Sequence, residues 1–599
     1  MNIQNPNRCF LGVSASVTGR SWADRLDARG AQTALAIAQR HGVPDLLARI
    51  VAGRGVALDE VPQYLDPSIR ALMPDPDSLT DMGAAVDRLA SAVLKGESVA
   101  VFGDYDVDGA TSTALLVSLL RTAGLYPLFH IPDRIFEGYG PNIGAIEQLA
   151  ARGVTLLVTV DCGTTSVETL AAARRLGLDV VVIDHHLPGD TLPEVTALVN
   201  ANRQDDLSQL GHLCAAGVVF MTLVGLSRRL RDLGHWTAER PAPDLLQSLD
   251  LVALGTVADV VPLRGLNRAY VSKGLIALRR RQRLGLTALM DVARLDGPPR
   301  PWHLGFLLGP RINAGGRIGD AALGTRLLLT DDPMEAKRIA AELDRLNTER
   351  QEVERAVLEA AEAEALAATG LEDAGASIVV SGEGWHPGIV GLVAARLKER
   401  FNRPAFAIAF NGETGTGSAR SIPGVDIGKA VHGAVEAGLL VKGGGHAMAA
   451  GLTVERRRLG DLRAYLEGQL AASVETARAD RALAIDGALT AGGATVALVE
   501  QVAKAGPFGS GNPEPVFAFP NHRLAYVETF GNGHIRARLA SNDGAVLKAV
   551  AFRCADEPLG RAMLAARGRL VHLAGTLDLD HWQGETKVSI RIRDMAQPA

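Results

Sequence analysis

The chain lacks several features that mark particular classes of protein. Its four cysteines lie far apart, at positions 9, 162, 214 and 554, and form no CxxC pair. This spacing argues against a structural zinc site and against a disulfide framework. No apolar run reaches the roughly 18 residues that a membrane helix requires. The first residues also lack the apolar stretch of a secretory signal. We therefore expect a cytoplasmic protein that makes no membrane contact.

The chain also has no large excess of charge of either sign. Lys and Arg number 62 and Asp and Glu number 67, which gives a formal net charge of −5. A strongly basic chain would indicate a nucleic-acid partner, so here any polyanion site must come from local clusters. The segment 264–283 is one such cluster, with seven basic residues and no acidic one. Two interpretations stay open for it: a solvated helix face, or a track for nucleic acid beside a catalytic cleft.

Short apolar runs alternate with helical patterns in the first half of the chain. Runs at 98–102, 155–160 and 179–186 are separated by segments with helical periodicity. This order is typical of parallel strands that are buried on both faces, and so of an α/β doubly wound domain. We expect an N-terminal helical segment over 1–75, this α/β domain over 76–330, a connecting helix over 331–370, a smaller α/β domain over 371–475 and a strand-rich domain over 476–599.

The segment that begins at Asp332 has no glycine for more than 30 residues, and its only proline is at the start. Its apolar residues recur at steps of three, four and seven, at Ile339, Leu343, Leu346, Val353 and Val357. Such spacing places one apolar stripe on a helix. An unbroken helix of this length suits a strut between domains. The alternative is two helices with a break at Asn347.

The C-terminal segment contains five short strand patterns within about 80 residues, separated by Gly, Asn and Asp turns. This pattern indicates a small barrel of the oligonucleotide-binding (OB) type. Its aromatic residues are Tyr526, Phe530, Phe552 and Trp582. They either stack on bases or fill the barrel core.

Acidic residues follow the first strand of the α/β domain. In "VAVFGDYDVDGATSTALL", Asp104, Asp106 and Asp108 stand at alternate positions between a strand and a helix. Ligands bind in the crevice beyond the carboxyl ends of such strands. Crowded carboxylates repel one another unless a cation lies between them. Helix caps and Asp-Gly turns are the alternative, but they account for only one or two of the three acids.

The next strands end in the same way. Asp161 follows 155–160, and Asp184, His185 and His186 follow the third strand. Asp259 follows a further apolar run, which we take as a fourth candidate strand. One strand-end aspartate is usually a helix cap, but several at one sheet edge, with histidines, favour a cation site. Oxygen ligands suit Mg²⁺, and imidazole shifts the preference towards Mn²⁺.

Phosphoester or phosphoanhydride hydrolysis is the leading chemistry for such a site. Two cations bridged by a carboxylate hold an attacking hydroxide in line with a phosphorus atom. No GxxxxGK[ST] motif occurs, which argues against a nucleotide-driven motor. The HExxH motif of zinc peptidases is also absent.

The motifs "DYDVDG", "TVDCG", "VIDHH" and "ADVVPL", in this order, resemble the four motifs of the DHH phosphoesterase superfamily. "VKGGGHAMAAGL" resembles the signature of its companion DHHA1 domain. "IPDRIFEGYG", "LGPRINAGGRIGDA" and "PFGSGNPEPVF" are similar to the bacterial single-strand-specific exonuclease branch. The resemblance covers essentially the whole chain. It implies a parallel-sheet DHH domain and a smaller α/β DHHA1 domain joined by a long helix, followed by an OB-fold nucleic-acid-binding barrel.

The resemblance also implies a role for each residue of the acidic and histidine motifs. Two Mn²⁺ or Mg²⁺ ions would be held by Asp106, Asp108, Asp161, His185 and Asp259. Asp161 would bridge the ions, and Asp104 would be a further ligand or a supporting acid. His186 would contact the scissile phosphate, with Asp184 orienting its neighbours. Many DHH proteins have a histidine where this chain has Phe102, which leaves the ligand set of the first metal open.

A second set of residues is expected to contact nucleic acid. By resemblance, Arg134 and Arg311 would bind a 5′-terminal phosphate as bidentate donors, although a lone arginine more often forms a surface salt bridge. The other candidates are Asn313 in "GPRINAGGR", Arg420 in "GSARSI", and Gly444, Gly445 and His446, whose backbone a strand of nucleic acid can approach closely.

From these residues and this resemblance we predict a metal-dependent 5′→3′ exonuclease that degrades single-stranded DNA to 5′-mononucleotides in recombination and repair. We expect a monomer that works with a helicase and a single-strand-binding protein. One alternative is an enzyme of the same superfamily that acts on small phosphate substrates, which would need neither the barrel nor the long helix. A catalytically inactive binding scaffold is the other, and it would gain nothing from crowded carboxylates.

Overall fold

The computed structural model describes residues 9–369, 375–479, 482–582 and 585–598. The chain forms two compact units. One, which we call the barrel unit, contains 1–73, 262–272 and 481–599. The other, the sheet unit, contains 74–261 and 273–480. Among the described residues, no helix combines the length and apolarity that crossing a bilayer requires.

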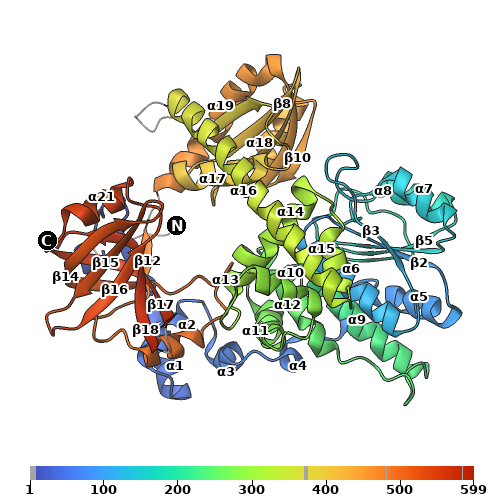
Figure 1. Cartoon of the computed structure of the whole chain (residues 1–599), viewed down its shortest axis with the longest axis horizontal. Helices are drawn as coiled ribbons and strands as arrows, with labels where there is room; N and C mark the ends of the chain where they lie inside the picture. Colours follow the sequence, from blue (N-terminus) through green and yellow to red (C-terminus); the bar gives the residue numbers. More distant parts are fainter. Residues whose placement is uncertain (1–8, 370–374, 480–481, 583–584, 599) are drawn as a thin grey trace. The chain divides into compact units, whose positions relative to one another are not determined.

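The sheet unit contains a five-stranded, fully parallel sheet in the order β3-β2-β4-β5-β6. Its strands are β2 (Val99–Gly103), β3 (Leu128–His130), β4 (Leu156–Val160), β5 (Asp179–Ile183) and β6 (Ala197–Val199). Every residue of β2 and β4 is buried, because helices cover both faces (Figure 1). One face packs against α7 (Ile143–Ala151) and α8 (Val167–Arg175), the other against α5 (Met82–Lys95), α6 (Val107–Thr122) and α9 (Ala215–Asp232). The predicted α/β class is confirmed.

The fourth candidate strand is instead a helix, α10 (Leu249–Ala258), and Asp259 is its C-terminal cap. This part of the prediction was wrong. Eight of the ten helix residues are buried, so no alternation of apolar and polar residues distinguishes its faces. Its length of ten residues exceeds the usual four to eight of a buried strand. α10 packs against α6 and α9, and so its end still reaches the strand-end acids.

The helices between residues 265 and 369 include the predicted connecting helix. They are α11 (Gly265–Arg279), α12 (Leu284–Val292), α13 (Pro301–His303), α14 (Gly309–Ile318), α15 (Leu323–Leu329) and α16 (Pro333–Thr369). α16 is continuous and 37 residues long, which confirms the long helix and excludes a break at Asn347. The Asn347 side chain is buried, and its Oδ1 accepts hydrogen bonds from Arg350 one turn later.

A second, mixed sheet follows α16 in the order β10-β11-β9-β8-β7. Its elements are β7 (Ile378–Glu383), α17 (Val390–Phe401), β8 (Ala405–Asn411), β9 (Thr414–Arg420), α18 (Ile427–Glu436), β10 (Lys442–His446), β11 (Ala449–Glu455) and α19 (Leu459–Ala479). β10 is an edge strand that pairs only with β11 among the described strands. This is the smaller α/β domain that the sequence predicts.

The barrel unit contains the predicted OB-type barrel, closed by pairing of β14 with β17. The barrel strands are β13 (Gly487–Ala488), β14 (Phe517–Phe530), β15 (His534–Ala540), β16 (Val546–Ala551), β17 (Leu570–Trp582) and β18 (Glu585–Ala596). The accompanying helices are α1 (Ala28–His41), α2 (Asp45–Ala52), α3 (Val61–Leu65), α4 (Ile69–Leu72), α20 (Val496–Ala503) and α21 (Pro558–Ala565). A parallel pair, β1 (Trp22–Asp24) and β12 (Leu483–Ile485), completes the unit.

The N-terminal segment is bonded to the barrel by buried polar contacts. Trp22 Nε1 donates to Asp594 Oδ2 at 3.0 Å. Arg25 and Arg54 both form ion pairs with the buried Asp486. Residues of α2 share one hydrophobic core with the barrel strands. The two ends of the sequence therefore fold as one body.

Three of the aromatic residues named above, Tyr526, Phe530 and Phe552, do not fill the barrel core. Tyr526 and Phe530 are half-buried, and Phe552 is 54% exposed. The core contains Phe517 and Phe519 instead. The Trp582 side chain lies outside the described residues.

Two histidines of the barrel unit are buried, with exposed fractions of 2% for His522 and 6% for His572. His522 Nε2 accepts a hydrogen bond from the Ala491 amide at 3.0 Å, and His572 Nδ1 accepts one from the Asn521 amide at 3.1 Å. Burial lowers the pKa of both rings. Each ring is therefore held in its neutral form in the folded protein.

Acid is expected to destabilise the barrel unit through these two rings. Their folded pKa lies below the unfolded value, so the unfolded chain binds more protons, and stability falls as the pH drops below about 6.5. In circular dichroism melts, the variant with both His522→Gln and His572→Gln should lose less Tm between about pH 7.5 and pH 5.5 than the wild type does. Parallel Tm profiles for the two proteins would contradict this assignment.

Candidate metal centre and phosphate site

The carboxyl ends of β2, β4 and β5 bring acids and histidines together in the sheet unit. Three sets of ligand atoms each lie within 4.8 Å of one another. The sets are Asp104 with Asp106 and Asp161, Asp108 with His185 and Asp259, and Asp161 with His185 and His186. His185 Nε2 lies 3.2 Å from Asp161 Oδ1, and 3.8 Å from Asp108 Oδ2 and Asp259 Oδ2. The structure thus places all the predicted ligands in one cluster.

The loop after β2 is fixed by helix N-termini and by a close backbone approach. Asp106 caps α6, and its Oδ1 accepts hydrogen bonds from the amides of Asp108 and Gly109. Asp108 accepts from two amides at the start of α9, at 2.6 and 2.9 Å. A Cβ on Gly109 would lie 2.4 Å from the Asp104 carbonyl oxygen. Only glycine fits there, so the DVDG sequence holds its acids in place through its backbone.

Backbone strain accompanies two of the acids. Asp161 has φ +62°, and Val260, which follows Asp259, has φ +60°. Left-handed backbone is unusual for any residue with a side chain, and a β-branched one is an outlier. Such conformations persist where the surrounding structure enforces them, and they cluster at functional sites.

The electrostatics of the cluster favour a bound cation. Burial and neighbouring carboxylates raise the pKa of Asp104, Asp161 and Asp259 well above the ordinary value. Burial lowers the pKa of His185, which leaves the neutral imidazole that a metal requires. Asp104 Oδ1 is buried and has no hydrogen-bond partner. A divalent cation would relieve the repulsion and complete the contacts of this oxygen, so the residues fit the implied metals.

Adding metal is therefore expected to stabilise the sheet unit. At a free Mn²⁺ concentration about 100 times its Kd, binding contributes about 2.7 kcal/mol. For a unit of this size that corresponds to a rise in Tm of about 3 °C. Differential scanning fluorimetry in EDTA and in Mn²⁺ measures the shift, with Ca²⁺ and Na⁺ as ionic controls. An equal Tm in EDTA and Mn²⁺ would contradict the metal centre.

His186 lies beside the cluster but has different partners from His185. Its Nδ1 donates to Asp184 Oδ1 at 2.8 Å and lies 4.0 Å from Asp161 Oδ1. Burial opposes protonation, but the hydrogen bond and charge of Asp184 raise the pKa of His186 to about 9. Asp184 also accepts from the amides of Thr164 and His185. His186 is thus a cation at neutral pH, held by a buried carboxylate.

An arginine cluster lies close to these acids. Burial, followed by the like charges of Arg134, Arg350 and Arg420, lowers the pKa of Arg317 to about 10. Burial and Arg134 also lower the pKa of Arg420. Within the described part of the chain, no carboxylate forms an ion pair with Arg134, Arg317 or Arg420. Arg420 instead bonds Ser418 Oγ at 3.0 Å. These three guanidinium groups are available for an external anion.

Arg311 is not part of this cluster. Its Nε donates to Asp344 on α16 at 2.9 Å, and its Nη1 donates to the Leu307 carbonyl. Asn313, two residues later, has its Oδ1 3.1 Å from the Val107 amide at the start of α6. The segment "GPRINAGGR" thus supplies a salt bridge, a helix contact and, at its last residue, Arg317.

Gly444, Gly445 and His446 lie on the edge strand β10. The space beside Gly444 is open, and Gly445 has φ +153°. His446 is exposed. β9, which carries Arg420, pairs with β11, and β11 pairs with β10. The outer edge of β10 pairs with no other strand among the described residues.

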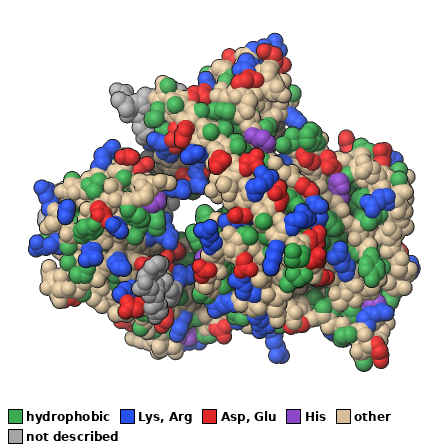
Figure 2. Space-filling view, viewed as in Figure 1, with side chains coloured by type: hydrophobic (Ala, Val, Ile, Leu, Met, Phe, Trp, Pro, Cys, Tyr) green, Lys and Arg blue, Asp and Glu red, His purple; other side chains and the backbone are tan. Residues whose placement is uncertain are grey.

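The basic segment 264–283 has several local partners. Arg281 pairs with Asp291, and Arg283 pairs with Asp250 at 2.9 Å. Arg268 packs 3.7 Å from the Tyr64 ring centroid and donates to backbone carbonyls of the barrel unit. Figure 2 shows Lys and Arg interspersed with Asp and Glu over the visible face, as the balanced composition predicts.

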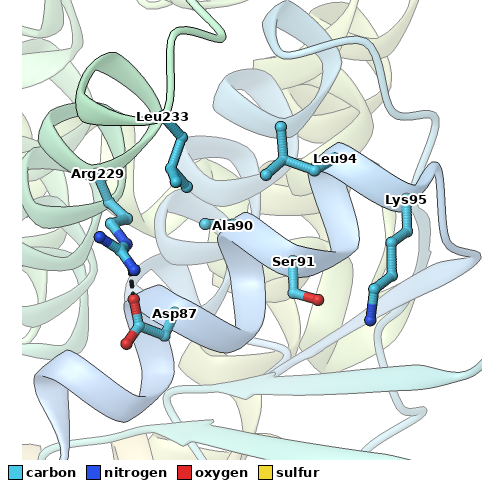
Figure 3. A pocket seen from close by; sticks show the side chains of 7 residues that line it. All are labelled: Asp87, Ala90, Ser91, Leu94, Lys95, Arg229 and Leu233. Atoms are coloured by element: carbon cyan, nitrogen blue, oxygen red, sulfur yellow. Dashed lines mark ion pairs between the residues drawn. The ribbon is translucent and has the colours of Figure 1, made fainter.

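Cavity shape alone does not identify the site. A shallow cavity of about 360 Å³ between α5 and α9 is bordered by Leu94 and Leu233, and closed at one end by the Asp87–Arg229 ion pair (Figure 3). It contains none of the metal-binding groups. The site is identified instead by its cluster of carboxylates and histidines and by the nearby arginines.

Three residues beside the site were not among those predicted. Tyr139 donates from its hydroxyl to the Asp161 carbonyl at 3.2 Å and lies 3.1 Å from His186 Nδ1. Asn200 Nδ2 donates to the His186 carbonyl at 2.8 Å. Asn200 directly follows β6, so the strand-end rule applied to "TALVNAN" would have indicated it. Arg317 stands in a segment that was singled out, but no local signal distinguishes it from Arg311.

Comparisons with known proteins agree with this geometry. The sequence matches the DHH family, N-terminal domain, over 98–256, the DHHA1 domain over 375–472 and the RecJ OB domain over 485–594. It is 37% identical to the single-stranded-DNA-specific exonuclease RecJ of Dickeya dadantii, over 92% of this chain and 96% of that protein. It is also 37% identical to the protein of that name from Escherichia coli, over 92% and 95%.

Solved structures give the same relation. The crystal structure of RecJ from Thermus thermophilus in complex with Mn²⁺ superposes with a TM-score of 0.77 at 30% identity, covering 95% of this chain and 78% of that chain. The complex of RecJ from the same organism with Mg²⁺ gives 0.72 at 29% identity, covering 95% and 77%. Motifs, fold and relatives coincide over nearly the whole sequence, and the chain belongs to the RecJ family.

Proposed function

We propose that this protein is a Mn²⁺- or Mg²⁺-dependent exonuclease that degrades single-stranded DNA from its 5′ end to 5′-mononucleotides. The observation that carries the proposal is the pairing of two sites in the sheet unit. A cluster of carboxylates and histidines that fits divalent cations lies next to three arginines without carboxylate partners among the described residues. The names of the RecJ relatives support DNA as the substrate.

The proposed chemistry is hydrolysis of a phosphodiester. Bound cations neutralise the charge of the phosphate and lower the pKa of an attacking water. Asp104, Asp106, Asp108, Asp161, His185 and Asp259 would hold them. His186, protonated and oriented by Asp184, would donate to a phosphate oxygen on which negative charge develops. Tyr139 would keep the His186 ring in place through its hydroxyl.

The arginine cluster supports the proposed polarity. A terminal phosphate carries more charge than a phosphodiester, and guanidinium groups bind it through charge-assisted, bidentate hydrogen bonds. Arg134, Arg317 and Arg420 would bind a 5′-phosphate and so place the adjacent phosphodiester at the metals. Gly444, Gly445 and His446 would let the strand approach the edge of the second sheet.

The outer face of the barrel is suited to single-stranded DNA. Phe530, His534 and Phe552 form a row with ring centroids 5.4 Å apart. Arginines lie over the neighbouring rings, with Arg538 6.0 Å from the Tyr526 centroid and Arg536 5.8 Å from that of Phe530. Aromatic and arginine side chains provide stacking surfaces for bases of any sequence. We propose this face as the binding surface for the strand beyond the scissile bond.

The cellular setting belongs to the same proposal. An enzyme limited to single strands needs another activity to separate duplex DNA, so a helicase is the expected partner, together with a single-strand-binding protein. We propose that it acts as a monomer in the cytoplasm, in recombination and repair. We also retain the proposed domain limits at residues 75, 330, 370 and 475.

Labelled DNA tests the activity and its direction. Single-stranded and duplex oligonucleotides, labelled at the 5′ or the 3′ end, are incubated with the protein and Mn²⁺. The 5′ label should appear at once as a mononucleotide, the 3′ label should persist on shortening fragments, and the duplex should resist. Equal release of both labels would refute the polarity. Hydrolysis confined to small phosphate compounds would favour the alternative enzyme.

A further inference from the structure

The loop that joins β3 to α7 is closed by one carboxylate. Glu137 Oε2 accepts hydrogen bonds from His130 Nε2 at 2.9 Å and from Asn142 Nδ2 at 2.8 Å. Its Oε1 accepts from the Asp133 amide at 2.9 Å. His130 is the last residue of β3, and Asn142 is the N-terminal cap of α7. Glu137 therefore ties both ends of the loop to its interior.

The same loop carries two side chains that reach the site. The Arg134 guanidinium lies 5.1 Å from the Tyr105 ring centroid, beside the strand-end acids. The Tyr139 hydroxyl contacts the Asp161 carbonyl and the His186 ring. The Tyr105 and Tyr139 rings meet edge to face, with centroids 6.5 Å apart. One loop thus contributes a residue to the arginine cluster and another to the histidine.

The hydrogen-bond partners of Glu137 favour its ionised form. Burial opposes ionisation, but the hydrogen bonds from the Asp133 amide, Asn142 and His130 lower its pKa. It is an acceptor of three hydrogen bonds from three separate parts of the loop. An ionised acceptor of this kind holds its donors more strongly than a neutral one. Neither Arg134 nor Tyr139 bonds Glu137 directly, so any influence on them passes through the loop backbone.

We propose that Glu137 is a positioning residue, whose carboxylate fixes the loop 131–142 so that Arg134 binds the terminal phosphate while Tyr139 orients His186. This rests on the proposed function for the role of Arg134. The two tasks are coupled because the same hydrogen bonds to Glu137 fix the positions of both side chains. Recognition of the 5′ end and readiness for hydrolysis then depend on the same three hydrogen bonds.

The test is Glu137→Gln, which keeps the size of the side chain but replaces one acceptor oxygen by a donor. Steady-state hydrolysis of single-stranded oligonucleotides with a 5′-phosphate and with a 5′-hydroxyl gives kcat/KM for each. Loss of supporting hydrogen bonds typically lowers activity roughly 10- to 100-fold, and we expect a loss in this range on the phosphorylated substrate. The ratio of the two kcat/KM values should fall, whereas partial unfolding lowers both equally.

Two further variants make the result specific. Glu147→Gln changes an exposed glutamate of α7 and should leave both kcat/KM values within about twofold, in the range of surface substitutions. Combining Glu137→Gln with Asn142→Asp reverses one donor and acceptor pair, and aspartate still caps α7. This double variant should recover most of the lost phosphate preference.

Hydrogen exchange gives a readout that does not depend on catalysis. Mass spectrometry of the metal-free protein should show faster exchange over 131–142 in Glu137→Gln, because His130 and Asn142 lose the shared acceptor oxygen that holds the two ends of the loop. Faster exchange with an unchanged substrate ratio would overturn the positioning role, as would unchanged exchange. A wild-type protein that hydrolyses DNA without preferring a 5′-phosphate would refute the phosphate site and this inference with it. Wild-type preference together with an unaffected variant would refute the inference alone.

Discussion

Replacing Asp161 with asparagine is expected to lower kcat on single-stranded DNA by roughly 10³-fold or more. Asp161 belongs to two of the three ligand groups and lies 3.2 Å from His185 Nε2. We propose that two cations would share Asp161. Losing such a carboxylate removes several kcal/mol of transition-state stabilisation, and each 1.36 kcal/mol is tenfold in rate. Single-turnover hydrolysis at saturating Mn²⁺ measures the effect. Asp190→Asn, at an exposed position shortly after the VIDHH motif, should behave as wild type.

The same variant should stabilise the metal-free protein. Burial and the surrounding carboxylates raise the pKa of Asp161, so its ionised form is disfavoured in the folded state. Its contribution to stability is present at low pH and is lost as the pH rises through the folded pKa. In EDTA at neutral pH, Asp161→Asn should therefore melt above the wild type, and in Mn²⁺ it should lose the metal-induced rise. Activity within tenfold of wild type would rule out the proposed site.

Arg317→Gln is expected to lower kcat/KM on a 5′-phosphorylated strand roughly 10- to 100-fold, while Arg311→Gln should have little effect. A hydrogen bond to a charged group contributes about 1.5–3 kcal/mol, which corresponds to this range. Arg317 has no carboxylate partner among the described residues, whereas Arg311 is paired with Asp344. Arg311→Gln should only reduce Tm slightly, since the Asp344 side chain is 37% exposed and ion pairs with a solvent-exposed partner contribute about 0–1 kcal/mol.

The substrate with a 5′-hydroxyl separates recognition from folding for this pair of variants. Arg317 Nη1 also donates to the Gly388 carbonyl at 2.9 Å, so the substitution removes a structural contact as well. Loss of that contact alone would affect both substrates equally. A selective loss with the phosphorylated strand supports the phosphate site. If Arg311→Gln were more harmful than Arg317→Gln, the result would instead support Arg311 as the phosphate-binding residue, as the sequence alone predicts.

Strand ends were the most predictable part of this site. Buried parallel strands read as continuous apolar runs, and the polar residue after each run must lie at one sheet edge, which is how Asp104, Asp161 and Asp184 were identified. Asp259 was identified as well, but through an element that proved to be a helix. A fully buried helix and a buried strand share the same apolar composition, and only the length of the run separates them.

The arginines and Tyr139 were less predictable for a physical reason. Whether Arg311 or Arg317 faces the acids depends on the rotation of α14 against α16, which residue types in "GPRINAGGR" do not encode. Tyr139 acts through a loop whose conformation Glu137 sets by contacts with β3 and α7. The grouping of residues 1–73 with the barrel likewise arises from buried partners more than 400 positions away, such as Arg54 and Asp486.

Because α16 is one continuous helix, its exact length, and not only its composition, sets the orientation of the elements that pack on its two halves. Its first half packs on α12 and α14, and its second half packs on β7 and α17. One inserted residue rotates everything beyond it by about 100° and moves it by about 1.5 Å. A single-codon insertion would thus turn the second sheet away from the first while leaving every side chain of the metal centre intact. We therefore expect a one-residue insertion in this helix to be more damaging than most single substitutions on its exposed face.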